Sequence, residues 1–142
     1  MRKYLTIIIL IFTTVFSSCS AQQQVSSIKE IVYKAHTRGS SKEILVKDNV
    51  IYTSVNSKKK EIRLTDKQKQ YLLSMLKEVN LVTMKDLQAP SNKRNTDGAL
   101  HAEIQVKKNN DVYTSCTFDD GNPPKELKAL VDEIFKLSKL KN

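Results

Sequence analysis

The segment LHAEIQVK, residues 100–107, decides the fold class because its side chains alternate strictly between apolar and polar. A period of two predicts a β-strand that buries one face and exposes the other. Such a strand needs neighbouring strands and a hydrophobic layer over its buried face. The side chains predicted to face the core are Leu100, Ala102, Ile104 and Val106.

The residues that follow predict a hairpin and a final helix. Residues 109–111, Asn-Asn-Asp, form a turn signal before a return strand over residues 112–118, in which Cys116 is expected to be a small buried hydrophobe. Asn122 and Pro123 then fit the N-cap and the first position of a helix. The apolar stripe of that helix consists of Leu127, Leu130, Val131, Ile134 and Phe135.

The residues upstream predict three strands and a first helix. Strands are expected over residues 28–36, 43–47 and 50–55, and the dipeptide Asp48-Asn49 between the last two favours a tight antiparallel hairpin. Thr65 and Gln68 have the spacing of a capping box, which opens a helix. Its apolar stripe consists of Tyr71, Leu72, Met75, Leu76 and Val79, and Asn80 is the expected stop.

The element order is therefore β-β-β-α-β-β-α. We expect one small α+β domain over residues 28–142, because a chain of 142 residues leaves no room for a second core. Its sheet should be mostly antiparallel with about five strands, and both amphipathic helices should pack on one face.

The first twenty residues carry an export signal. Arg2 and Lys3 precede an apolar stretch over residues 5–16, which is shorter than the ~18 residues that a membrane-spanning helix needs. The sequence Phe16-Ser17-Ser18-Cys19 resembles the lipobox of bacterial lipoproteins, although leucine is usual where Phe16 stands. The resemblance implies that Cys19 carries a lipid and becomes the new N-terminus.

On this interpretation residues 1–18 are a signal peptide and residues 19–27 are a polar tether. The protein is then expected outside the cytoplasm, held to a membrane of the bacterial cell envelope. Cleavage after Ala21 is the alternative and would release a soluble protein. Lipidation of Cys19 would leave Cys116 without an intramolecular disulfide partner.

The formal charge is +9, and it becomes +7 once Arg2 and Lys3 are removed. This excess favours anionic partners such as lipid head groups, acidic polysaccharide or an acidic protein. Nucleic acid is not expected as a partner of an exported protein. Lys58-Lys59-Lys60 is interpreted as a solvated hairpin exit, with anionic lipid binding as the alternative.

No sequence signature of catalysis or of a cofactor site is present. We therefore predict no enzyme activity, no cofactor and no metal. The alternatives are a Cys116 nucleophile and a metal site in which His36 and His101 meet with Glu103 or Asp119 as further ligands. Residues 119–122, Asp-Asp-Gly-Asn, lack the spacing of a calcium loop and are interpreted as a turn.

The stretch FDDGNPPKELKALV, residues 118–131, resembles the last strand, Asp-Gly turn and helix of the emfourin family, which are small bacterial inhibitors of thermolysin-like metalloproteases. The turn Arg38-Gly39-Ser40-Ser41 is similar to the Gly-rich turn of that family, with serines where glycines are expected. The likeness covers about a third of the mature chain. It implies a shared fold more than a shared activity.

We predict a lipid-anchored, non-enzymatic binding module, with protease inhibition as the activity that the resemblance implies. The alternative is an envelope maintenance protein that binds anionic glycan or lipopolysaccharide. We expect a monomer. The candidate contact segments are the Thr37 to Ser41 turn and the Pro90 to Gly98 loop. The loop lies in the irregular connection over residues 81–99, and long irregular connections are usually functional. The candidate contact residues of the turn and the loop are Arg38, Gly39, Ser40, Ser41, Lys93 and Arg94.

Overall fold

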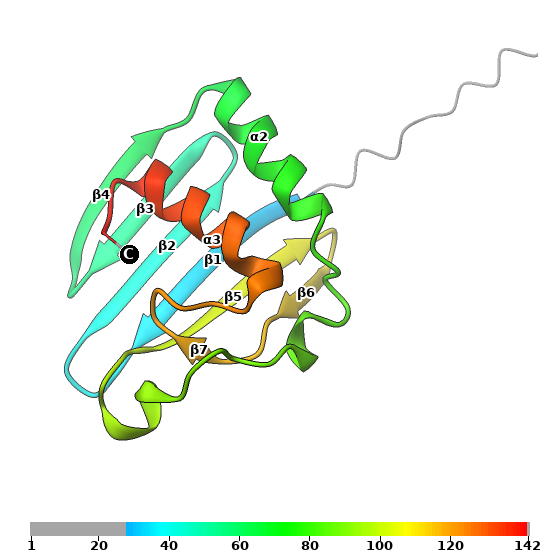
Figure 1. The fold of residues 1–142 in the computed structure, drawn as a ribbon. Coiled ribbons are helices and arrows are strands. Elements are labelled where there is room, and N and C mark those ends of the chain that lie inside the picture. The colour runs from blue at the N-terminus through cyan, green and yellow to red at the C-terminus, as the bar shows by residue number, and fades with distance from the viewer. Residues whose placement is uncertain (1–27, 142) are drawn as a thin grey trace, which may run out of the picture.

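A computed structural model describes residues 28–141 as an antiparallel sheet with two helices, which confirms the predicted α+β class. Both helices lie on the same face of the sheet (Figure 1). The sheet has seven strands, not about five, in the order β4-β3-β2-β1-β5-β6, and β7 also pairs with β5. The strands are β1 (Ile28–His36), β2 (Ser41–Lys47), β3 (Val50–Val55), β4 (Lys58–Arg63), β5 (His101–Lys108), β6 (Asp111–Thr114) and β7 (Phe118–Asp119).

Strands β1 and β5 are far apart in the sequence but pair along almost their full length. Val32 lies opposite Gln105, and His36 lies opposite His101. The alternation predicted for residues 100–107 is confirmed for β5, where Ala102, Ile104 and Val106 are fully buried. These three side chains face the layer of helices.

The helices are α2 (Asp66–Lys77) and α3 (Lys125–Ser138). The predicted capping box is confirmed at α2: the Thr65 hydroxyl accepts from the Gln68 backbone N–H, and the Gln68 side chain accepts from the Thr65 backbone N–H. The first helix ends at Lys77, earlier than predicted. The reason is that Asn80 serves the next turn, where its side chain accepts from the backbone N–H groups of Val82 and Thr83.

One continuous core lies between the sheet and the helices. Tyr33 is at its centre, with its ring 5.0 Å from that of Phe135 in α3 and 6.1 Å from that of Phe118 in β7. Of the first stripe, Leu72 and Leu76 are buried, whereas Tyr71 is 52% exposed. The fully buried large side chains are Tyr33, Phe118, Ile31, Ile44, Ile51, Leu72, Met84, Ile104, Leu127, Leu130, Ile134 and Val106.

The sequence prediction was wrong about the return strand, which breaks into β6 and β7. Its alternation also fails, because Val112 is exposed. The break lies at Ser115, whose hydroxyl accepts a hydrogen bond from the Ile104 backbone N–H at 3.0 Å. The Cys116 backbone N–H then donates to the Met84 carbonyl in η1 (Met84–Asp86).

The predicted start of the last helix was also wrong. The N-cap of α3 is Pro124 and its first residue is Lys125. Asn122 belongs to the preceding turn instead, since its backbone N–H donates to the Asp119 carbonyl and its side chain donates to the Ser91 hydroxyl. Gly121 in the same turn has a φ of 83°, a backbone conformation that suits glycine.

Candidate functional site

The predicted contact turn is a short connection between β1 and β2. It is closed by the backbone N–H of Thr37, which donates to the Ser40 carbonyl at 2.8 Å. Arg38 and Gly39 are exposed at its tip. A side chain at Gly39 would meet no atom within 4 Å, so the turn does not require glycine at this position.

The turn is attached to the neighbouring hairpin by Asn56, which lies between β3 and β4. The Asn56 side-chain oxygen accepts from the Ser40 hydroxyl at 3.1 Å and from the Ser41 backbone N–H at 2.9 Å. Asn56 and Ser57 both have positive φ, as a two-residue hairpin turn requires. The contact turn and the start of β4 therefore form one connected surface.

The second predicted contact segment is fastened by a buried carboxylate. Asp119 of β7 accepts hydrogen bonds from the Ser91 hydroxyl and from the backbone N–H groups of Lys93 and Arg94, at 2.8 and 3.0 Å. The guanidinium of Arg94 adds a charged hydrogen bond to Asp119 at 3.0 Å and another to the Ser91 carbonyl at 2.6 Å. The short helix η2 (Lys93–Thr96) is thereby fixed against β7.

This network decides which of the two predicted basic residues is available at the surface. The side chain of Arg94 is only 13% exposed and belongs to the internal network around Asp119. The side chain of Lys93 is exposed and makes no ion pair with another described residue. Lys93 is thus the one of the pair whose charge a partner can reach.

The network also controls the ionisation of Asp119. Burial by itself would raise the pKa of this carboxyl group, since its side chain is only 2% exposed. The hydrogen bonds from Ser91, Arg94 and Lys93 outweigh that effect and hold the pKa well below its usual range. Asp119 is therefore a stable carboxylate that is already fully occupied by internal donors.

Asp120 forms a second buried connection, directly after β7. It accepts from the Tyr33 hydroxyl at 2.6 Å and from the Lys42 ammonium at 2.7 Å. Burial, followed by the hydrogen bond to Asp120, raises the pKa of Tyr33 far above its usual range. Consecutive aspartates thus hold β7 to two different parts of the molecule.

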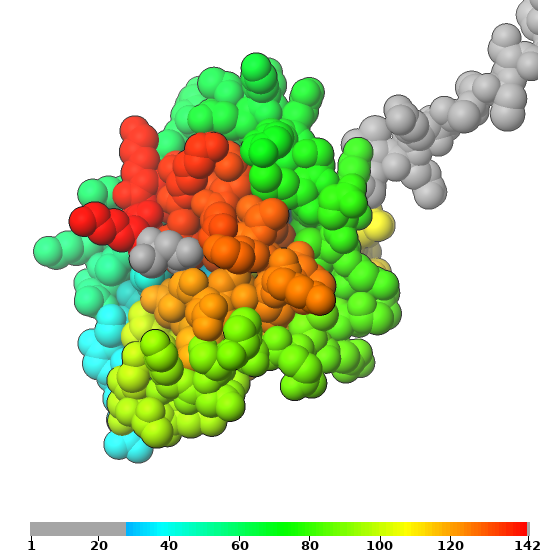
Figure 2. Space-filling view, in the orientation of Figure 1, coloured from blue at the N-terminus to red at the C-terminus, as the bar shows by residue number. Residues whose placement is uncertain are grey.

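The two predicted contact segments lie at the same end of the sheet. The turn follows His36 and the loop precedes His101, and these histidines pair across β1 and β5 with ring centroids 6.3 Å apart. In Figure 2 the turn, in cyan, and the η2 loop, in yellow-green, lie side by side at the lower left. We call this end, with residues 37–41 and 91–98, the contact end.

The two histidines do meet, but the described residues do not complete a metal site around them. No group of three or more His, Cys, Asp or Glu side chains suited to a metal occurs within residues 28–141. Asp119, which was considered as a further ligand, points its carboxylate at the η2 loop and accepts from donors there. This arrangement does not support the metal alternative.

Cys116 is the free thiol among the described residues. It is partly buried, and burial is the main effect that raises the pKa of its thiol. A raised pKa keeps the sulfur protonated and poorly nucleophilic at neutral pH. This environment fits a packed side chain better than the alternative role of a catalytic nucleophile.

Strand β4 was missed in the sequence and adds a second surface to the site. It forms the outer edge of the sheet, and its residues are exposed except for the partly buried Ile62. The exposed residues include Lys58, Lys59 and Lys60, and no ion pair joins these lysines to another described residue. The expected hairpin exit is therefore a strand edge that carries uncompensated charge.

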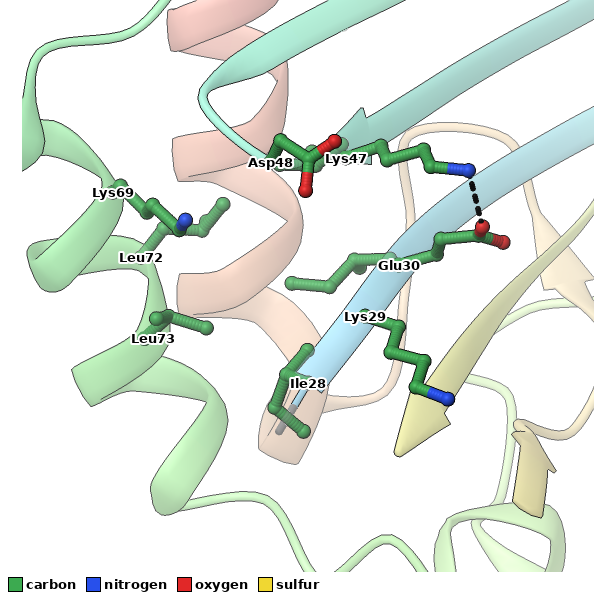
Figure 3. A pocket seen from close by; sticks show the side chains of 10 residues that line it. Ile28, Lys29, Glu30, Lys47, Asp48, Lys69, Leu72 and Leu73 are labelled. Carbon is green, nitrogen blue, oxygen red and sulfur yellow. Dashed lines mark ion pairs between the residues drawn. The ribbon is translucent and has the colours of Figure 1, made fainter. Parts of the chain in front are cut away.

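A hollow of about 130 Å³ lies at the opposite end, between α2 and the start of β1. Figure 3 shows Leu72 and Leu73 of α2 on one side and Ile28 of β1 on the other, with the Glu30 to Lys47 ion pair of 3.0 Å close by. The volume is well under the roughly 300 Å³ at which small-molecule sites begin. We assign no substrate to this hollow.

Cys19 and the rest of the predicted signal and tether lie outside the described residues. Within residues 28–141, neither helix has the length and hydrophobicity that crossing a bilayer requires. No family model, curated protein or solved structure matches the chain. The resemblances to lipoproteins and to emfourins stay predictions.

Proposed function

We propose that this protein is a lipid-anchored, non-enzymatic binding module of the cell envelope whose contact end meets a protein partner, with a metalloprotease as the first candidate. The observation that carries the proposal is the fastening of the η2 loop by Asp119. A loop that is already ordered loses little conformational entropy when it binds. Rigid loops on a small scaffold are typical of binding modules.

The position of the contact end supports the same function. Strand β1 has nine residues and runs from Ile28 to the contact end, a distance of roughly 30 Å. A lipid at Cys19 would be joined to Ile28 by a tether that spans at most about 30 Å. A tether of this length would leave the contact end free to meet a partner in the aqueous compartment.

Inhibition of a thermolysin-like metalloprotease tests the inhibitor form of the proposal. We expect the full chain, solubilised in mild detergent, to inhibit at micromolar concentration. The double variant Arg38→Glu and Lys93→Glu should be weaker, because both side chains are exposed at the contact end. The double variant Lys67→Glu and Lys125→Glu is the matched control, since it changes the charge equally and both lysines are exposed outside the contact end. Absence of inhibition by the unchanged chain would remove the inhibitor form.

The anchor is tested by mass spectrometry of the N-terminal peptide from membranes. We expect the first residue to be Cys19 with acyl chains attached. A mature protein that begins at any other residue, or that keeps residues 1–18 in the cytosol, would contradict the lipoprotein prediction.

The alternative, an envelope maintenance protein that binds anionic glycan or lipopolysaccharide, is supported by the uncompensated lysines of β4. Charge-driven binding weakens as salt rises, because screening acts over about 10 Å at 0.1 M salt. Titration of lipopolysaccharide at increasing sodium chloride separates the two functions. The protease partner would be favoured if inhibition persists at high salt and the protein does not bind lipopolysaccharide.

A further inference from the structure

The backbone of β4 has one side that no other strand of the described part of the chain occupies. The Leu64 backbone N–H donates to the Asn49 carbonyl at 2.7 Å, just beyond the end of the β3–β4 ladder. Antiparallel bonds recur at every second residue, so Lys58, Lys60 and Ile62 also direct their backbone groups toward β3. The intervening residues, Lys59, Glu61 and Arg63, direct their N–H and C=O groups outward.

This outward side lacks the features that usually block a strand edge, apart from charge. The register of β4 with β3 runs without a bulge from Lys58 to Arg63, and the strand contains no proline. Four of its six residues are basic and one is acidic. Lysine on an edge prevents pairing with a second copy of the same edge, because like charges would meet.

The same charge attracts a strand of opposite sign. Side chains alternate along β4, so Lys58 and Lys60 lie on the face that carries the helices, and Lys59 and Arg63 lie on the open face. An extended segment with acidic side chains would place carboxylates beside these cations while its backbone bonded to the outward groups. Backbone hydrogen bonds supply affinity in this mode of recognition and side chains supply selectivity.

We infer that β4 is a docking edge that accepts an extended acidic segment of the partner protein as an additional strand. The inference rests on the proposed binding function and names the chemistry of the partner. Asn56 joins the contact turn to the start of β4 through its bonds to Ser40 and Ser41. A single partner can therefore touch the contact turn and add a strand to β4.

The direct test uses a fluorescein-labelled octapeptide of alternating glutamate and threonine, followed by anisotropy with the full chain in mild detergent. Two peptides are controls. The same glutamate and threonine peptide with every backbone nitrogen methylated keeps the charge but lacks the backbone N–H donors, and alternating lysine and threonine reverses the charge. We expect only the unmethylated glutamate and threonine peptide to bind well. Equal binding of the methylated peptide would overturn the inference and would show charge attraction alone.

The matched variants are Glu61→Pro and Glu61→Thr. Both remove a carboxylate, but only proline removes the outward N–H, and proline is tolerated at an edge where that group faces solvent. We expect Glu61→Thr to bind the acidic peptide at least as well as the unchanged chain. Glu61→Pro should bind about tenfold more weakly. Equal affinity of the two variants would contradict strand addition.

An NMR spectrum of the backbone amides of the unchanged chain keeps the test decisive if Glu61→Pro fails to fold. On addition of the peptide, the amide resonances of Lys59, Glu61 and Arg63 should shift more than those of Lys58, Lys60 and Ile62. Shifts that do not alternate would contradict the inference. The protease assay gives an independent result: inhibition without peptide binding would overturn only the docking edge, and peptide binding without inhibition would overturn only the inhibitor form.

Discussion

The two edges of the sheet differ in how the rest of the described chain packs against them. At one edge, β6 is partly exposed, but β7 is buried, and the segment that contains η1 and η2 is attached there by Asp119 and by the Cys116 backbone N–H. At the other edge, no strand among residues 28–141 pairs with the outer side of β4, which exposes lysines. We call these the closed edge and the open edge. We therefore expect stability to be concentrated at the closed edge, and the proposed partner would dock at the open edge.

Removal of the fastening carboxylate should have the largest effect. Asp119→Ala would leave the Arg94 guanidinium mostly buried without its charged partner, which typically costs about 3 to 5 kcal/mol. Urea unfolding measures the change in the free energy of unfolding. Asp119→Asn is the milder control because its amide oxygen still accepts hydrogen bonds. A loss under about 1 kcal/mol for Asp119→Ala would show that the closed edge does not depend on this network.

Ionisation of Asp119 should make the free energy of unfolding depend on pH, and this effect should be intermediate in size. Its pKa in the folded protein lies well below the unfolded value of about 3.9. The stability from its ionised form is therefore fully present above that value and is lost as the pH falls toward the folded pKa. The difference in unfolding free energy between the unchanged chain and Asp119→Asn should shrink from about pH 6 to about pH 2.5. A constant difference would contradict the assignment.

Changes at the open edge should have the smallest effect on stability. Replacing Lys58, Lys59 and Lys60 together by threonine should alter the free energy of unfolding by no more than about 0.5 kcal/mol per residue. The variant should however self-associate, because the charge that keeps two copies of β4 apart is gone. Analytical ultracentrifugation measures this. A variant that sediments as a monomer at high concentration would show that the lysines are not needed to prevent pairing of two copies of β4.

The parts of the fold that could be predicted are those with a local signal. Strand β5 has a strict alternation, and α2 begins at a capping box whose two residues are three positions apart. Strand β4 has almost no buried face, so the residues from Lys58 to Glu61 show no alternation of apolar and polar side chains. The available signal was the Asn56-Ser57 dipeptide before it, since asparagine tolerates the positive φ of a hairpin turn.

The exposure of Arg38 and Lys93 could be predicted, but the internal partners of Arg94 could not. Arg38 and Lys93 are exposed as the contact prediction requires. Arg94 has a partner 25 positions away, and nothing in the local sequence distinguishes it from Lys93. Asp119 was interpreted as a turn residue because its partners approach only through the tertiary fold. Long-range pairing of this kind leaves no periodic pattern in a single sequence.

Amide hydrogen exchange measured residue by residue tests the contrast between the edges most directly. We expect slow exchange at Lys93 and Arg94, although they lie in an irregular segment, because their N–H groups donate to buried Asp119. We expect fast exchange at Lys59 and Glu61, although they lie in a strand, until an acidic peptide is added. Fast exchange at Lys93 and Arg94, or slow exchange at Lys59 and Glu61 in the free protein, would contradict it.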